Sequence, residues 1–269
     1  QKWGRKLALT CVKIMLAAVV GIGICGVAAG IGVFRGILSS TPTIRLSDVV
    51  AVGEATIVYD KEGNEIDQYV STNSNRLSVG MDEIPDYMGK AFVAIEDERF
   101  YQHNGIDVKG ILRAGYQFIK TGGEEAQGAS TITQQLLKNT VFTDWTSEGS
   151  NKIKKIKRKI QEQYLALEIT KYYSKDEILL RYMNAINLGQ NTLGVESASL
   201  RYFGKHCSDL TLSECAVIAS ITQNPSKYNP IRHPEDNAVR REKCLNKMLE
   251  LGFVSQSEYD EAMADTDAV

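Results

Sequence analysis

Hydrophobic and polar positions divide the chain into an apolar run, a short alternating stretch and a long helical stretch. Residues 14–34, IMLAAVVGIGICGVAAGIGVF, carry no charged side chain. A helix rises about 1.5 Å per residue, so a run of this length spans a hydrocarbon layer of about 30 Å. The pattern predicts one transmembrane signal anchor, and a cleaved signal peptide stays open as the alternative.

Residues 35–84 are predicted to form a linker that contains a β-hairpin. Two short runs typical of strands, ATIVYD and EIDQYV, flank the turn sequence KEGN. In this turn Gly63 can adopt positive φ.

Between residues 85 and 264 the pattern predicts a mostly α domain of roughly eight helices. A Ser or Thr three positions before a Glu or Gln marks a capping box, which begins a helix. Gly204 and Gly252 stand where helices would end. The capping pairs are Thr131–Gln134, Ser174–Glu177, Thr211–Glu214 and Ser255–Glu258.

Charge is unevenly distributed, although the formal total is only −2. Lys2, Arg5, Lys6 and Lys13 precede the apolar run with no acid among them. Positive residues flanking a membrane span stay on the cytoplasmic side, so residues 1–13 are predicted to be a cytoplasmic tail. We therefore expect a single-pass protein of the cell membrane with an extracytoplasmic folded domain.

The cysteines match no metal-binding framework. Cys207, Cys215 and Cys244 lie outside the anchor, and the chain contains no CxxC, HExxH or Walker sequence. We expect neither zinc nor nucleotide chemistry, and no nucleic-acid partner. A Cys207–Cys215 disulfide stays open.

A carboxylate at the end of an apolar run is the first candidate for chemistry. In AIEDERFYQHNGID, residues 94–107, Glu96 follows Phe92 by four positions and lies at the edge of the predicted buried face. Partial burial raises the proton affinity of a carboxylate, which suits it to act as a general base. The alternative is a solvated surface pair between Glu96 and Arg99.

Hydroxyls and amides are concentrated in residues 128–139, GASTITQQLLKN, where Lys138 follows one turn later. Helix capping explains one hydroxyl, but not three hydroxyls and two amides within six residues. This density is typical of a surface that binds sugar hydroxyls or phosphate oxygens near a helix N-terminus.

A predicted helix over residues 151–170 carries an apolar stripe and, roughly opposite, a basic row that ends at Glu162. Lys155, Arg158 and Lys159 form this row and can clamp a pyrophosphate beside the carboxylate. The alternatives are a solvated face held by an Arg158–Glu162 pair, or attraction to anionic lipid. The stripe consists of Ile153, Ile156, Ile160, Tyr164 and Leu167.

Five segments resemble, in order, the five motifs of the peptidoglycan glycosyltransferases, glycosyltransferase family 51. They are EDERFYQHNGID, GASTITQQLLKN, RKIQE, ILLRYMNAINLG and RREKCLNKM, within residues 85–262. The resemblance implies a mostly α, lysozyme-like glycosyltransferase domain over residues 85–264, preceded by the anchor and hairpin. It also implies a mobile, membrane-dipping jaw at about 118–150, with lipid contacts from Leu137, Val141, Phe142 and Trp145.

The activity implied by the resemblance is polymerisation of lipid II into glycan strands at the outer face of the cytoplasmic membrane. Glu96 would deprotonate the acceptor sugar's 4-hydroxyl, which attacks the anomeric carbon of the growing chain with inversion and expels undecaprenyl pyrophosphate. Glu162 would be a second acid that orients the leaving group or a metal. A loosely bound divalent cation, Mg²⁺, is expected to help neutralise the pyrophosphate. The implied substrate-binding residues are Asp97, Arg99, His103, Gly128, Ser130, Thr131, Gln134, Gln135, Lys138, Lys155, Arg158, Lys159 and Asn184.

Expected partners are lipid II, the lipid-linked glycan chain, membrane lipid, moenomycin-type inhibitors, and cell-division or elongation proteins. Two alternatives stay open: a membrane-anchored lytic enzyme that cuts the same polymer, and a non-catalytic cell-wall scaffold. The basic row favours synthesis, because cutting a bond between two sugars releases no pyrophosphate. Whether a transpeptidase domain follows Val269 also stays open.

Overall fold

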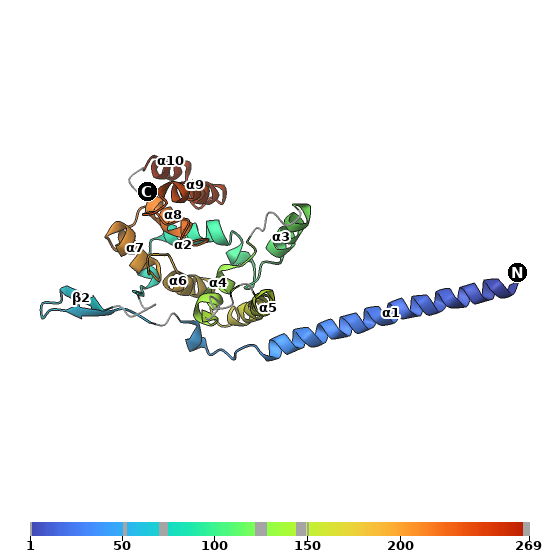
Figure 1. Cartoon of the computed structure of the whole chain (residues 1–269). Helices are drawn as coiled ribbons and strands as arrows, with labels where there is room; N and C mark the ends of the chain where they lie inside the picture. Colours follow the sequence, from blue (N-terminus) through green and yellow to red (C-terminus); the bar gives the residue numbers. More distant parts are fainter. Residues whose placement is uncertain are drawn as a thin grey trace. The chain divides into compact units, whose positions relative to one another are not determined.

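The computed structural model divides the chain into two compact units, residues 1–43 with 152–161 and residues 44–151 with 162–269 (Figure 1). The structure describes the chain apart from residues 1, 51–52, 70–74, 122–127, 144–148, 150 and 266–269.

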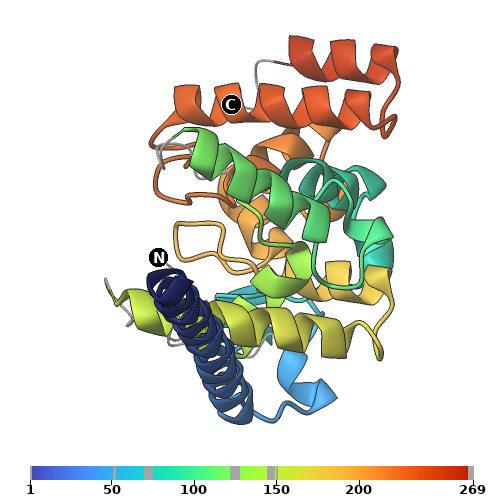
Figure 2. The ribbon, with the colours of Figure 1, turned by 90° about the vertical axis from the view of Figure 1, so that its right-hand side faces the viewer.

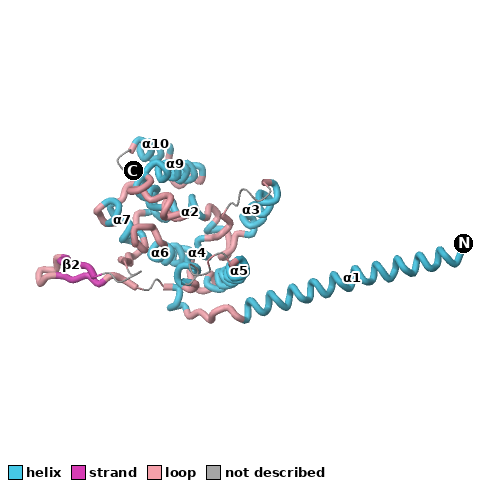
Figure 3. Tube along the Cα trace, viewed as in Figure 1, coloured by secondary structure: helices cyan, strands magenta, loops and turns pink. Residues whose placement is uncertain are grey.

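The first unit is built on α1, Lys2–Ser39, the long dark-blue helix of Figure 1, which Figure 3 shows as one continuous helix. Within it, Val19–Ser39 is long and apolar enough to cross a membrane, and none of this stretch is buried inside the structure. The predicted span, residues 14–34, overlaps this stretch, and the helix continues beyond it to Ser39. A continuous apolar helix is therefore present where the sequence predicts an anchor.

The first half of α5, Lys152–Ile169, belongs to the same unit. Gln161 Nε2 donates hydrogen bonds to the carbonyl oxygen of Ile37 and to Ser40 Oγ, both at 3.2 Å. These bonds hold the end of α1 against the middle of α5.

The predicted hairpin is confirmed. Strands β1, Thr56–Tyr59, and β2, Glu65–Tyr69, pair antiparallel. Asp60 Oδ1 accepts the backbone N–H groups of Glu62 and Asn64 at 2.9 and 2.8 Å, and Gly63 takes φ 87°. The carboxylate and the glycine together close the turn.

The second unit is helical, as predicted, and the structure describes nine α-helices from Asp86 onward where roughly eight were expected; α5 spans both units. The four predicted capping boxes begin α4, α6, α8 and α10. Gly204 ends α7 in the left-handed conformation, and Gly252 follows α9 with φ 69°. Besides α5, the helices of this unit are α2 (Asp86–Glu96), α3 (Val108–Lys120), α4 (Ile132–Thr140), α6 (Lys175–Ala185), α7 (Val195–Phe203), α8 (Leu212–Ser220), α9 (Pro234–Glu250) and α10 (Gln256–Ala264).

Helix α2 is central to the core of this unit. It packs against α6, α8 and α9, and α10 in turn packs on α9 (Figure 2). Phe92 and Tyr182, both fully buried, meet edge to face with ring centroids 5.5 Å apart. Because its apolar residues are enclosed, α2 holds its last residue, Glu96, in a fixed place. The predicted relation to lysozyme stays a prediction.

The predicted apolar stripe of α5 is not its buried face. Ile153 and Ile156 are 80% and 60% exposed. In the second unit the buried α5 residues include Glu162, Leu165 and Ile169. A pattern of large apolar residues marks a candidate face, but tertiary packing decides which face is enclosed.

The expected lipid contact of Leu137 is wrong, because the side chain is fully buried in the core. Val141 and Phe142 are half-buried against that core, and Trp145 lies outside the described residues. Exposed apolar side chains line α3 instead, at helical spacings of four, four and three. They are Val108, Leu112, Tyr116 and Ile119.

Candidate active site

A cleft of about 870 Å³ opens in the second unit at the C-terminal end of α2. Helices α2, α3, α4 and α9 line it, together with the segment after α8 and residues 128 and 130. Among the described residues, the cleft has five cationic side chains and three carboxylates. They are Arg113, Lys138, Arg240, Lys243 and Lys247, and Glu96, Asp97 and Glu98.

Three side chains donate hydrogen bonds to the Glu96 carboxylate. Thr222 Oγ1 and Arg240 Nη2 lie 2.6 and 3.1 Å from Oε1, and Gln135 Nε2 lies 2.8 Å from Oε2. The side chain of Glu96 is only 12% exposed, and that of Arg240 is 10% exposed. The base candidate is therefore nearly enclosed and held by fixed donors, which is how an active site positions a carboxylate.

The alternative of a Glu96–Arg99 surface pair is wrong. Arg99 Nη2 lies 2.6 Å from Asp107 Oδ2, and its Nη1 lies 2.5 Å from Glu98 Oε1. Arg99 does not line the cleft, and it holds the loop that follows α2.

Glu98 forms ion pairs with cations at the edge of the cleft. Arg113 Nη1 is 3.1 Å from Oε1, and Lys247 Nζ is 3.9 Å from Oε2. Partial burial raises the pKa of Glu98, but the hydrogen bond from Arg113 and the charge of Arg99 outweigh this effect and lower it. Glu98 therefore stays ionised and holds Arg113 and Lys247 at one edge of the cleft.

Asp97 connects the end of α2 to the start of α4. Its Oδ2 accepts the backbone N–H of Ile132 at 3.0 Å, and its Oδ1 lies 2.9 Å from His103 Nε2. A carboxylate at a helix N-terminus is stabilised by the helix dipole. The contact fixes α4, and hence Gln135 on its next turn, relative to Glu96.

A glycine lets the loop between α2 and α3 approach α5. Gly105 takes φ 89°, and a Cβ there would clash with the backbone carbonyl of Ala166. The Gly105 carbonyl accepts a hydrogen bond from Thr131 Oγ1 at 2.6 Å. Any other residue at position 105 would push this loop, and with it the start of α4, out of place.

Several predicted site residues meet in the cleft. These are Glu96, Asp97, Gly128, Ser130, Gln135 and Lys138. Their roles with substrate stay predictions.

Other predicted substrate-binding residues serve local structure. Thr131 and Gln134 are buried and form the capping box of α4. The His103 side chain is 9% exposed and pairs with Asp97. These residues position the cleft and do not line it.

Asn184 lies outside the cleft lining, and its predicted contact with substrate stays a prediction. Its Oδ1 accepts the Val79 backbone N–H at 3.1 Å, and its Nδ2 donates to the Val79 carbonyl at 3.0 Å. Both ends of the amide therefore hold the segment before α2. A motif residue can be retained in a family for folding, and the sequence alone does not separate this role from binding.

The basic row is divided between the two units. Lys155, Arg158 and Lys159 belong to the first unit and Glu162 to the second, where it is fully buried. Glu162 does not line the cleft. The pyrophosphate clamp and the second acid therefore stay predictions.

The described residues contain no group of three or more His, Cys, Asp or Glu side chains that could hold a metal ion. In the cleft, Glu96 is paired with Arg240, and Glu98 with Arg99 and Arg113. These carboxylates do not fit a metal site made by the protein alone.

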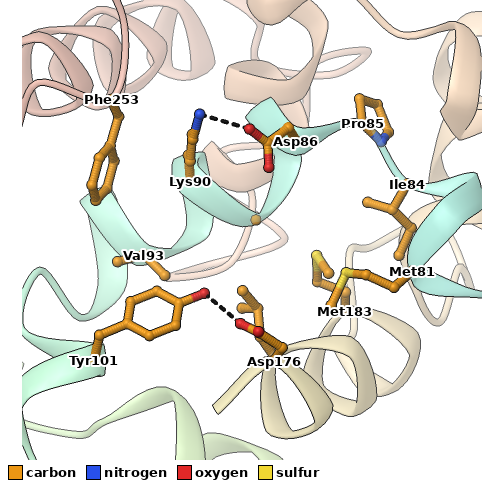
Figure 4. A pocket seen from close by; sticks show the side chains of 12 residues that line it. Met81, Ile84, Pro85, Asp86, Lys90, Val93, Tyr101, Asp176, Met183 and Phe253 are labelled. Carbon is orange, nitrogen blue, oxygen red and sulfur yellow. Dashed lines mark hydrogen bonds and ion pairs between the residues drawn. The ribbon is translucent and has the colours of Figure 1, made fainter.

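A second hollow, of about 390 Å³, lies between α2 and α6 (Figure 4). Tyr101 OH donates to Asp176 Oδ1 at 2.9 Å, and Lys90 Nζ lies 2.7 Å from Asp86 Oδ2. The polar side chains of the lining are thus bonded to each other, and the rest of the lining is apolar or glycine. The larger cleft, where polar groups converge on one carboxylate, is the candidate active site.

Sequence reasoning missed several cleft residues. Arg240, Lys243 and Lys247 lie in the segment RREKCLNKM, which resembles a family motif but predicts no role for an individual side chain. Arg113 and Thr222 lie outside every quoted motif. Tertiary packing brings Arg113 to Glu98 and Thr222 to Glu96.

Comparison with known proteins identifies the family of this helical domain. A family model described as Transglycosylase matches residues 62–249, and the chain belongs to this family. Penicillin-binding protein 1A of Clostridium botulinum is 41% identical over 253 residues, which cover 91% of this chain and 29% of the relative.

Two further curated relatives support the same family. Penicillin-binding protein 1A of Clostridium perfringens is 40% identical, with 92% of this chain and 37% of the relative covered. Penicillin-binding protein 1F of Bacillus subtilis is 41% identical, with 75% and 27% covered. The crystal structure of penicillin-binding protein 1A from Haemophilus influenzae is 23% identical with a TM-score of 0.44, covering 80% of this chain and 21% of that one. The chain thus spans only about a third of the length of the curated relatives it matches.

Proposed function

We propose that this chain is a peptidoglycan glycosyltransferase that polymerises lipid II at the outer face of the cytoplasmic membrane. The observation that carries the proposal is Glu96, a nearly buried carboxylate held by three donors within a cleft lined by five described cations. A base beside fixed positive charge suits a reaction in which a hydroxyl loses its proton and a diphosphate departs.

In the proposed reaction Glu96 accepts the proton of the acceptor sugar's 4-hydroxyl. The freed oxygen forms a bond to the anomeric carbon of the lipid-linked glycan chain, on the face opposite the pyrophosphate. The bond from that carbon to the pyrophosphate oxygen breaks, and its electron pair leaves with undecaprenyl pyrophosphate. The configuration of the anomeric carbon is therefore inverted.

Thr222 directs its hydroxyl to the charged carboxylate of Glu96. Its Oγ1 lies 2.6 Å from Glu96 Oε1 and also 2.9 Å from the Ala219 carbonyl oxygen. A hydroxyl donates only one hydrogen bond, so the nearby charged carboxylate is the favoured acceptor.

The cations of the cleft are proposed to bind the phosphate groups of the two lipid-linked substrates. Lys138, in the last turn of α4, lines the cleft together with Ser130 and residue 128, which precede that helix. Arg113, Lys243 and Lys247 line it from α3 and α9. Two cationic groups suit a reaction in which the donor and the acceptor each carry a diphosphate.

We propose that any Mg²⁺ requirement arises from the pyrophosphate of the substrate. The described carboxylates do not build a site by themselves, and Mg²⁺ commonly binds through substrate phosphates with one or two protein carboxylates. The apolar helix α1 is proposed to anchor the domain with its N-terminus in the cytoplasm.

The test is incubation of the purified chain in detergent with labelled lipid II, or with finished glycan, each with and without Mg²⁺. The proposal expects polymer from lipid II and no cleavage of glycan. Release of fragments from glycan, with lipid II unchanged, would instead identify the lytic alternative.

A further inference from the structure

The carboxylate of Glu96 is asymmetrically bonded. Among the described residues, Oε1 accepts two hydrogen bonds, from Thr222 and Arg240, whereas Oε2 accepts one, from Gln135. Each carboxylate oxygen has about two lone-pair sites. Oε2 therefore keeps one site for an incoming proton, and Oε1 does not.

The contact at Oε2 depends on which end of the Gln135 amide faces Glu96. A carboxylate only accepts hydrogen bonds, so the NH₂ end must point to it, and the amide oxygen must point away. On the far side, Tyr182 OH lies 3.2 Å from Gln135 Oε1 and donates to it. Tyr182 thus satisfies the oxygen and favours this orientation of the amide.

Tyr182 is suited to a fixed role of this kind. Its side chain is fully buried in α6, and its ring packs edge to face on Phe92 of α2. Burial and the negative charges of Glu96 and Asp97 raise the pKa of Tyr182 well above its usual value, although Arg240 opposes this shift. The phenol therefore keeps its proton, and it can donate, throughout the working pH range.

We propose that Tyr182 is a positioning residue that acts through Gln135 and keeps Glu96 Oε2 as the oxygen that receives the acceptor's proton. Without the Tyr182 hydroxyl, the Gln135 amide can rotate and present its oxygen to Glu96. Two facing oxygens repel when Glu96 is ionised, so the rotated state favours a protonated Glu96 that cannot act as a base. This inference rests on the proposed glycosyltransferase function.

The first variant is Tyr182→Phe, which removes the hydroxyl and keeps the ring that packs on Phe92. We expect kcat for lipid II polymerisation to fall about tenfold, because the loss of one hydrogen bond typically changes a rate by about this factor. KM should change little, and the acidic limb of the pH–rate profile should move to higher pH. An unchanged kcat and an unchanged acidic limb would overturn the inference.

The matched control is Tyr202→Phe. Tyr202 OH donates to the Leu188 carbonyl at 2.7 Å, and the residue does not line the cleft. This variant also loses a hydroxyl that bonds inside the domain, so it should lower the melting temperature and leave the pH profile unchanged. An equal shift of the profile in both variants would show a general structural effect and overturn the inference.

A double-mutant cycle tests whether Tyr182 acts through Gln135. In a Gln135→Ala background, Tyr182→Phe should produce no further fall in kcat, because the link to Glu96 is already absent. A full tenfold fall in that background would show that Tyr182 acts by another route and overturn the inference.

Gln135→Glu provides a second test that keeps Tyr182 intact and so does not depend on Tyr182→Phe folding. While the introduced carboxyl group is protonated, it can donate to Glu96 Oε2 and accept from Tyr182, as the amide does. Activity should survive at low pH and disappear as the introduced group ionises, which moves the alkaline limb to lower pH; a profile like that of the wild type would contradict the inference. Failure of the proposed function is distinguishable, because the unmodified chain would then form no polymer at all.

Discussion

Arg240 Nη2 lies 3.1 Å from Glu96 Oε1, although 144 residues separate the two side chains in the sequence. Arg240 Nε also donates to the Ser220 carbonyl at 3.0 Å, so three helical segments meet at this contact. The ion pair is nearly enclosed, because each side chain is only about one-tenth exposed. The packing of α9 on α2 thus completes the environment of the base candidate.

Replacing Glu96 with Gln should abolish most polymerisation. The amide keeps the size of the side chain but cannot act as a base, and general-base catalysis contributes about 10²- to 10⁴-fold. We expect kcat to fall within that range and the melting temperature to fall as well, because the nearly buried Arg240 loses its charged partner. The measurement is the initial rate of lipid II consumption in detergent. A parental rate would contradict the base assignment and leave the scaffold alternative.

The control for this variant is Glu98→Gln. Glu98 lies two residues on and lines the same cleft, but it bonds to Arg99 and Arg113 and not to the groups around Glu96. Its loss should weaken the placement of cations, raising KM more than it lowers kcat. An identical loss of kcat in both variants would show that the loss in Glu96→Gln comes from the changed charge of the cleft and not from the loss of a base.

Replacing Arg240 with Met should lower both stability and activity. Removal of one partner from a nearly buried ion pair leaves an uncompensated charge, which typically costs about 3 kcal/mol. We expect urea denaturation to show a loss of this order in the free energy of unfolding, and kcat/KM to fall at least tenfold. Lys243→Met is the control, since Lys243 is an exposed cation on the same helix and cleft. Equal stability of the two variants would contradict the prediction.

The sequence predicts the local structure well because its signals are local. The KEGN turn and the Ser or Thr capping boxes depend on side chains within four residues, and the structure contains each of them. The site is harder to predict because Arg240 and Thr222 reach Glu96 only through the packing of α9 and of the segment after α8. Asn184 shows the opposite difficulty, since a polar motif residue serves the backbone of Val79.

Asn184→Ala should therefore affect folding more than catalysis. The change leaves the Val79 N–H and carbonyl without their partner, and unsatisfied buried groups cost about 1–3 kcal/mol. We expect thermal unfolding to shift to lower temperature, with kcat and KM unchanged well below the transition. Asn187→Ala is the control at an exposed amide nearby. A raised KM for lipid II with unchanged stability would support the original binding role.

The exposed stripe of α3 should contact the membrane surface. Leu112, Tyr116 and Ile119 are 69%, 66% and 81% exposed, and such a row of apolar side chains on a helix is typical of an interfacial segment. A fluorophore attached through Tyr116→Cys, in the full chain with Cys11 and Cys25 replaced by Ser, should be quenched by brominated lipids in vesicles. The same label at Ile231→Cys is the control, at an exposed loop position. Equal quenching at both positions would contradict the prediction.

Glu258 should make the domain sensitive to acid. Tyr87 OH donates to its Oε1 at 2.5 Å, and the Ser255 N–H and hydroxyl donate to its Oε2 at 2.7 Å. The Tyr87 bond is the largest of the causes that lower the pKa of Glu258 from 4.5 to about 2. Its contribution to stability is therefore present above pH 4.5 and is lost as the pH falls towards 2, because the unfolded chain takes up the proton first.

The measurement is the urea midpoint of the wild type and of Glu258→Gln between about pH 6 and pH 2, a range that brackets both pKa values. The wild type should be more stable at the upper end, and the difference between the two midpoints should shrink as the pH falls below 4.5. Glu261→Gln on the same helix is the control, because Tyr87 directs its hydroxyl to Glu258 and feels Glu261 only through its charge. A difference for Glu258→Gln that stays constant across the whole range would show that the Tyr87 contact does not hold the carboxylate ionised in the folded protein.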